Sequence, residues 1–292
     1  MLPDEQIVRA ELQARFAEAF QGMSGLLSFA AGLVTSGEIR LTQLRGLDPA
    51  VVQVALGLYV KACKQFRSIL ALCEYGLGED AHALTRNLFE TTVALVFVLR
   101  HRVTLTSQGK TLPRVRGKPL TAKLRARLYM ANIAFEHQRT LYEWERTKGL
   151  KHAAKTLDKK GISERVNAAE KAIGQEWSKR LKERRTYSGT TLKDLALTLR
   201  LAQAYATLYR SASWSTHATD LPQFVRLAPR AGTPTLYLSP GDAWVPQTIR
   251  GASLLLVICI EFLNERFGLG HEQRIQEEKH RLGFGRTRGR AS

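Results

Sequence analysis

The sequence is poor in cysteine and has no long apolar run. Its 292 residues include three cysteines without paired spacing, so neither a disulfide framework nor a zinc motif is expected, and a reducing compartment suits them. The longest apolar runs, 93–99 and 254–260, are much shorter than the roughly 20 residues that span a bilayer. We therefore expect no membrane insertion, no metal site and no cofactor.

The first 20 residues lack the apolar stretch of a secretory signal, because acidic residues alternate there with arginines. This predicts a cytoplasmic protein. Hydrophobic residues make up 44% of the chain, which is enough to build a core, and no repeat of fixed period is present.

Acidic residues are scarce: 26 Asp and Glu stand against 44 Lys and Arg, a formal charge of +18. Residues 100–160 alone hold 16 Lys and Arg but four Asp and Glu. Such an excess suits phosphate backbones or anionic lipid headgroups, and a solvated basic face is the alternative. The apolar residues of this segment are needed for the core, which favours nucleic acid over a membrane. The predicted nucleic-acid contacts are Arg114, Arg116, Lys118, Lys123, Arg125 and Arg127.

Apolar residues recur at helical spacing through most of the chain, which predicts an all-α bundle of about eight or nine helices. Asp48 followed by Pro49 is typical of a helix start, and Gly76 stands where a left-handed C-cap is expected. Two helices are predicted before residue 37, and further helices at about 79–100, 122–148, 163–186, 191–217 and 246–267.

Two segments interrupt this pattern. Residues 101–121 indicate a long, basic, mobile connection, and the four prolines of 221–244 indicate a loop excursion with one short hairpin. We expect a single helical domain over 1–270, followed at 271–292 by a basic helix end and a flexible arginine-glycine tail.

The first candidate constellation is Arg86 with Glu90, one turn apart on a helix expected to be central in the bundle. Two buried charges require partners or a function. His82 lies one turn earlier, but a metal site formed by His82 and Glu90 would lack further ligands.

The second candidate lies on the helix predicted at 191–217. Five polar or aromatic residues follow spacings of 4, 3, 4 and 3 there: Gln203, Thr207, Arg210, Trp214 and His217. A guanidinium that holds a phosphate and an imidazole that moves the proton of a ribose 2′-hydroxyl suit phosphodiester chemistry, and Trp214 can stack on a base. Alternatively, His217 caps a helix end and Arg210 pairs with Glu90 or Glu183.

The run KACKQFRSILALCEYGLGEDAHALTRNLFETTVAL and the later YRSASWSTH resemble a bacterial family known as domain of unknown function 5677. The resemblance covers roughly Ala50 to Leu221. The residues that match the family pattern are Arg86, Glu90, Tyr209, Ser213 and His217.

More remotely, a helical bundle with an arginine shortly before a histidine is similar to the HEPN superfamily of bacterial toxin and phage-defence proteins. Many of its members are metal-independent ribonucleases that dimerise so that two such motifs share a cleft. The resemblance implies that Arg210 holds the phosphate, that His217 is catalytic and that Glu90 is auxiliary, with Arg86 beside it. The residue after the arginine, often Asn, His or Asp in that superfamily, is Ser211 here.

The leading prediction is therefore an HEPN-like protein that binds RNA rather than DNA, with metal-independent ribonuclease activity in a bacterial defence or toxin system, and a homodimer is compatible with it. The alternative is a non-catalytic nucleic-acid-binding or adaptor protein, in which Arg86, Glu90 and His217 form a structural network. An enzyme that acts on a small anionic substrate stays open, although no phosphate loop, nucleophile elbow or metal motif supports it.

Overall fold

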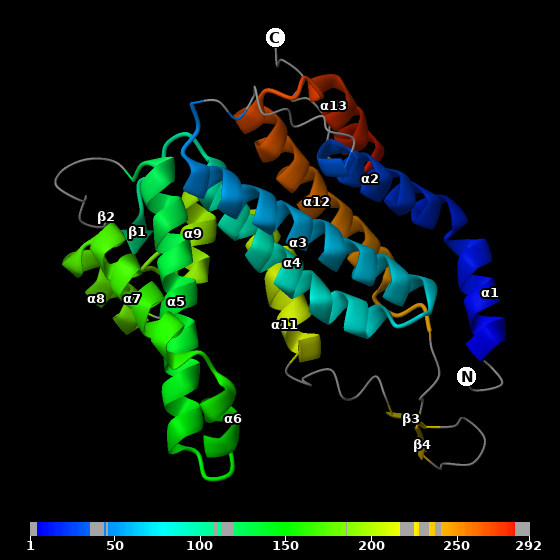
Figure 1. Cartoon of the computed structure of the whole chain (residues 1–292). Coiled ribbons are helices and arrows are strands. Elements are labelled where there is room, and N and C mark those ends of the chain that lie inside the picture. The colour runs from blue at the N-terminus through cyan, green and yellow to red at the C-terminus, as the bar shows by residue number, and fades with distance from the viewer. Residues whose placement is uncertain are drawn as a thin grey trace. The chain divides into compact units, whose positions relative to one another are not determined.

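The structure, a computed structural model, confirms the predicted all-α fold. It describes residues 5–35, 44, 46–107, 110–111, 120–184, 186–216, 225–227, 234–236 and 241–283. The described residues form helical segments α1 to α13 and one π-helical segment, η1, which is more than the eight or nine helices predicted (Figure 1).

The residues group into two compact units by their internal contacts. Unit 1 comprises Met1–Arg45, Leu58–Thr92 and Ala202–Ser292, and unit 2 comprises Gly46–Gly57 and Val93–Leu201. Two of the four unit boundaries fall inside the long helices α3 (Pro49–Glu74) and α4 (Gly78–Leu99). The single domain predicted over 1–270 stays a prediction.

The start and end of α3 agree with the sequence signals. The Asp48 carboxylate accepts a hydrogen bond from the Ala50 backbone N–H at 3.0 Å, as an N-cap does. At the other end Gly76 has φ +74°, and the Leu77 N–H donates to the Leu72 carbonyl at 2.9 Å. These contacts are those of a Schellman cap, in which glycine adopts the left-handed conformation at no steric cost.

In unit 1, α1 (Glu5–Arg15) and α2 (Ala17–Thr35) precede α3, and α12 (Val245–Phe267) packs against α2 and α13 (Glu272–Arg281). The hydroxyl of buried Tyr59 on α3 donates to the Ala30 carbonyl on α2 at 2.9 Å. Helix α12 has the length and apolar composition of a membrane span, but 61% of its apolar window is buried, as in the core helix of a folded domain.

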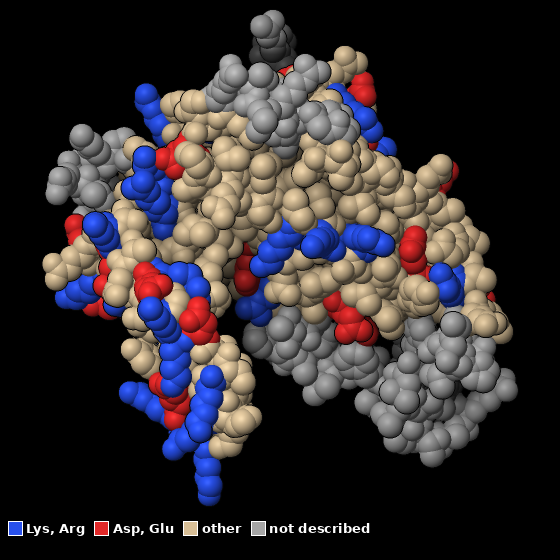
Figure 2. Space-filling view, in the orientation of Figure 1, with Lys and Arg blue, Asp and Glu red and all other residues tan. Residues whose placement is uncertain are grey.

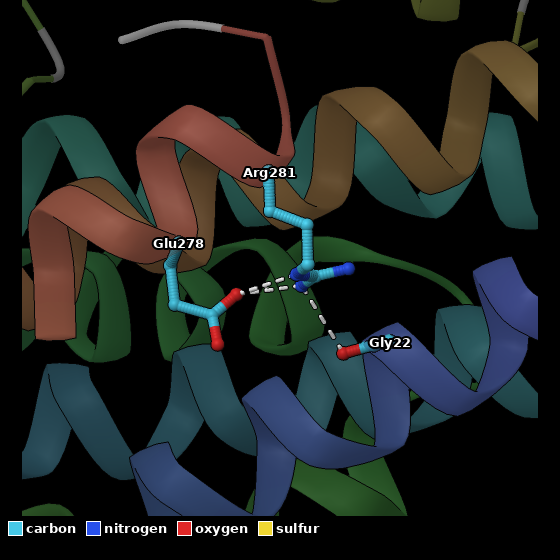
Figure 3. A network of polar contacts seen from close by, with 3 residues as sticks. All are labelled: Gly22, Glu278 and Arg281. Atoms are coloured by element: carbon cyan, nitrogen blue, oxygen red, sulfur yellow. Dashed lines mark hydrogen bonds and ion pairs between the residues drawn. The ribbon is translucent and has the colours of Figure 1, made fainter.

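Helix α13 is attached to α2 through Arg281. Its guanidinium donates to Glu278 on its own helix at 2.6 and 3.0 Å and to the Gly22 carbonyl at 3.3 Å (Figure 3). A Cβ atom at Gly22 would lie 2.2 Å from an Arg281 nitrogen. Glycine at this position therefore lets the guanidinium approach the backbone of α2.

In unit 2, α5 (Ala122–Arg146) packs against α6 (Lys151–Thr156), α7 (Lys159–Ile173) and α8 (Gln175–Arg184). The helix predicted at 163–186 is thus two helices. Gly174, with φ +82°, ends α7 and accounts for the break.

The helix predicted at 191–217 is also interrupted. Helix α9 (Leu192–Thr198) ends in a Schellman cap: the Leu201 N–H donates to the Ala196 carbonyl at 2.8 Å, and Arg200 is the left-handed residue, with φ +60°. The chain then continues as α10 (Ala202–Ala204), the π-helix η1 (Tyr205–Tyr209) and α11 (Arg210–Thr216).

Two short ribbons complete the described fold. Strands β1 (Thr106–Ser107) and β2 (Lys110–Thr111) pair antiparallel within the predicted connection. Strands β3 (Val225–Leu227) and β4 (Pro234–Leu236) pair antiparallel in the proline-rich segment, with Val225 opposite Leu236. A hairpin is therefore present where the sequence predicted one.

Candidate functional site

The structure brings together Arg86 and Glu90 of α4 and Tyr209 of η1, all in unit 1. Arg86 Nε lies 3.5 Å from Glu90 Oε1, and the guanidinium carbon of Arg86 lies 5.0 Å from the centre of the Tyr209 ring. The side chains of Arg86 and Glu90 are 24% and 46% exposed. The expectation of a buried pair was therefore wrong, because this face of α4 is only partly covered.

The charges of the pair act on Tyr209 in opposite directions. Burial of the ring and the Glu90 carboxylate raise the pKa of the Tyr209 hydroxyl, and Arg86 partly offsets this increase. The hydroxyl is therefore protonated at neutral pH, and its hydrogen bonds with Glu90 and Arg86 make it part of the cluster.

A hollow of about 500 Å³ adjoins the cluster. Its lining is formed by α4 together with one residue of α3: Leu72, Asp80, Ala83, Leu84, Arg86, Asn87 and Glu90. Apolar side chains and both charges of the pair thus face the same space, which is the usual composition of a binding site.

Aromatic packing holds η1 against α4. The Phe89 ring centre lies 6.1 Å from that of Tyr205 and 5.4 Å from that of Tyr209, and the two tyrosine rings stack with their centres 5.1 Å apart. A π-helical turn is uncommon and is frequent at functional sites. Here it lies directly before Arg210.

Arg210 on α11 is exposed, as are Gln203 on α10 and Thr207 on η1. Glu90 pairs with Arg86 rather than with Arg210, and the described residues include no ion-pair partner for Arg210. The side chain of Trp214 and the whole of His217 lie outside the described residues. The predicted Arg210 and His217 pair is therefore described only at its arginine.

His82 has a different environment from the one its spacing indicated. It is 1% exposed, with Nδ1 at 3.2 Å from the Thr248 hydroxyl and Nε2 at 3.1 Å from the Ser211 hydroxyl. Its ring stacks on Trp244 at 4.4 Å between centres. His82 therefore links α4 to α11 and α12, and no cluster of three or more potential metal ligands occurs among the described residues.

The residues predicted to contact nucleic acid have different positions. Arg114, Arg116 and Lys118 lie outside the described residues. Lys123 is exposed, but its ammonium lies 2.8 Å from Asp48 Oδ2, and the hydrogen bond between them lowers the pKa of Asp48. Arg127 is half-buried.

The prediction that Arg125 contacts nucleic acid was wrong, because its side chain is completely buried. Its guanidinium donates to the carbonyls of Leu120, Val98 and Arg100, and it lies 5.9 Å from the Phe97 ring centre. Arg125 therefore ties the start of α5 to the end of α4 inside unit 2 and presents no charge to a ligand.

Sequence reasoning listed Tyr209 in the family pattern but assigned it no role, and it missed Asp80 and Asn87 in the lining of the hollow. A signal for Tyr209 was present, because Tyr205 and Tyr209 repeat an aromatic ring at a spacing of four residues. Asp80 and Asn87 had none, since exposed polar residues occur on most helices.

Comparison with known proteins yields one match. No curated protein and no solved structure is similar to the chain. The model of a family of unknown function, DUF5677, matches residues 52–226, which include most of α3 and all of α4, η1 and α11, and thus the Arg86, Glu90 and Tyr209 cluster. Because the match covers more than half of the sequence, the chain belongs to the family of unknown function DUF5677.

Proposed function

We propose that the protein is an HEPN-like RNA-binding protein that cleaves RNA without a metal ion. The observation that carries this proposal is Arg210, an exposed arginine with no ion-pair partner among the described residues, seven positions before His217. An arginine without a carboxylate partner keeps its donors available for two phosphate oxygens.

The proposed reaction is the attack of a ribose 2′-oxygen on the neighbouring phosphorus. The bond from 2′-oxygen to phosphorus forms while the bond from phosphorus to 5′-oxygen breaks, which leaves a 2′,3′-cyclic phosphate and a 5′-hydroxyl end. His217 accepts the 2′-hydroxyl proton and returns it to water, and the departing 5′-oxygen takes a proton from water. Arg210 stabilises the charge on the phosphorane oxygens.

The Arg86, Glu90 and Tyr209 cluster supports this proposal by its position. Tyr209 directly precedes Arg210, and its ring is fixed by Phe89 and by the Arg86 guanidinium. We assign Arg86 and Glu90 the role of positioning residues that hold η1, and therefore Arg210, in one orientation.

The test is incubation of the purified protein with mixed RNA in the presence of a chelator. We expect products with 2′,3′-cyclic phosphate ends, and a loss of at least about 100-fold in cleavage rate for His217→Ala and for Arg210→Ala. Arg67→Ala, which removes an exposed arginine of α3, is the matched control and should cleave normally. Cleavage that persists unchanged in both site variants would sink the catalytic proposal.

The contacts within the cluster favour a second candidate, a non-catalytic binding protein. The 3.5 Å ion pair and the guanidinium over the Tyr209 ring are contacts that a purely structural network would also make. Melting temperatures of the same variants separate the candidates. A drop of several degrees in His217→Ala with unchanged RNA affinity and no cleavage in the parent protein supports the structural network.

A further inference from the structure

The end of the α5 and α6 hairpin in unit 2 carries an uncompensated positive charge. Between residues 146 and 157 the chain has four Lys and Arg and no Asp or Glu. All four are exposed: Arg146, Lys148, Lys151 and Lys155. We call these four residues the hairpin-tip cluster. In Figure 2 blue side chains gather at the end of the lobe that α5 and α6 form in Figure 1.

The four cations lack acidic partners within the part of the chain that the structure describes. Acids close in sequence are used elsewhere: Glu145 pairs with Lys159, and Asp158 caps α7 by accepting the Gly161 N–H at 2.9 Å. Glu143, one turn before Arg146 on α5, is exposed and forms no ion pair with the cluster in the described part of the chain. The positive charges of the hairpin-tip cluster are therefore available to a ligand.

The hairpin holds this charge on a firm support. Leu141, Ala154 and Ile162 form a small buried cluster between α5, α6 and α7, and Trp144 and Leu157 pack against it. The tight turn between α5 and α6 uses Gly149 with φ +95°, a conformation that glycine adopts at no steric cost. The cations thus project from a packed scaffold.

This packing occupies the apolar side of the hairpin. It therefore bears on whether the cations bind a membrane surface or a polynucleotide. Binding to a membrane surface requires a continuous apolar helix face that is free to enter the lipid. Near the tip the exposed large apolar residues are Tyr142 on α5, at 51%, and Leu150 in the turn, at 40%. Exposed Tyr142, one turn before Arg146, adds an aromatic ring of the kind that stacks on bases. Both features favour a polynucleotide.

We propose that the hairpin-tip cluster binds the phosphate backbone of the RNA that the protein acts on. This inference rests on the proposed function, and it adds residues 146–155 to the predicted contacts at 114–127, of which the structure overturns Arg125. Each cation neutralises one phosphate and releases a counterion, so binding weakens steeply with salt.

The test compares two triple variants that lose the same charge. The tip variant, Lys148→Gln with Lys151→Gln and Lys155→Gln, removes three of the four cations of the hairpin-tip cluster. The control variant, Lys171→Gln with Lys179→Gln and Lys193→Gln, removes three exposed lysines of unit 2 outside the cluster. The probe is a fluorescent 20-nucleotide RNA with 2′-O-methyl groups, which cannot form a cyclic phosphate, and the readout is anisotropy from 50 to 200 mM salt. Circular dichroism checks that both variants fold.

We expect Kd to rise about tenfold or more at 100 mM salt in the tip variant, and its slope of log Kd against log salt to fall by roughly 2 to 3. The control variant should stay within about twofold of the parent protein. An equal loss of RNA affinity in both variants would mean that RNA binds to the positive charge of the whole surface, which overturns the inference. Absence of RNA binding in the parent protein overturns it as well. If the tip variant no longer binds phosphatidylserine vesicles but keeps the RNA affinity of the parent protein, the inference is overturned in favour of a membrane.

Failure of the inference and failure of the proposed function give different results. If the tip variant binds RNA normally while His217→Ala abolishes cleavage, the docking surface lies elsewhere and the ribonuclease proposal stands. If the tip variant loses binding while His217→Ala and Arg210→Ala leave cleavage unchanged, the docking surface stands and the catalytic assignment fails.

Discussion

Three arginines of this chain lie in three different environments. Arg125 is buried and bonded to carbonyls, Arg86 lies over a tyrosine ring beside a carboxylate, and Arg210 is exposed. Spacing along a helix indicates which arginines share a face, but it does not indicate which face another element covers. For this reason Arg125 was wrongly assigned to a surface.

Arg125 provides the prediction at this scale. In Arg125→Met the carbonyls of Leu120, Val98 and Arg100 lose a buried donor, and the free energy of unfolding should fall by about 3 kcal/mol. Arg127→Met, two residues away and half-buried, should lose less than about 1 kcal/mol. Urea denaturation followed by circular dichroism measures both, and equal losses would contradict the donor role of Arg125.

At the scale of elements, sequence patterns predicted the helices well where strong local signals stand at their ends. Asp48 and Gly76 bound α3 as predicted, and Gly268 ends α12 with φ +61°. The segment from 191 to 217 was predicted as one helix because its break has no glycine or proline. Arg200 occupies the left-handed position there, and the packing of Leu199 and Leu201 in the core fixes it.

The same reasoning explains what was predicted of the site. Arg86 and Glu90 are paired because residues four apart on any α-helix are neighbours, which the sequence alone reveals. Tyr209 joins them only because a π-helical turn sets its ring against Phe89, and no local signal predicts such a turn. The half-exposure of the pair depends on distant segments, so it could not be predicted either.

The left-handed conformation of Arg200 at the end of α9 predicts how substitutions there change stability. A side chain in the left-handed region costs about 1 to 2 kcal/mol, and glycine avoids this cost at the price of more freedom in the unfolded chain. Arg200→Gly should therefore raise the free energy of unfolding by about 0.5 to 1 kcal/mol. Arg200→Ala keeps the Cβ atom and should gain nothing. A gain in the alanine variant equal to that of the glycine variant would point to the arginine charge instead.

At the scale of the molecule, the three thiols report on unit 1 alone. Cys63, Cys73 and Cys259 all belong to that unit. Burial raises the pKa of Cys73 and of Cys259 to about 12 from the ordinary value of 9.0. Their contribution to stability is therefore complete below pH 9 and is lost as the pH rises toward 12. At pH 8 the folded protein should hide both thiols from a labelling reagent, which needs the thiolate.

Whether the chain is one cooperative domain can then be decided by destabilising unit 2 and observing unit 1. Helices α3 and α4 run through both units without a break, and unfolding one unit alone would cut their hydrogen-bond ladders in the middle. We therefore expect Arg125→Met, a change in unit 2, to lower the urea midpoint of Cys73 and Cys259 labelling as much as the midpoint of the helical signal at pH 8. The contrary result is a labelling midpoint that keeps its parent value while part of the helical signal is lost at lower urea. The two units would then unfold separately, because the loss of the buried arginine would destabilise unit 2 alone.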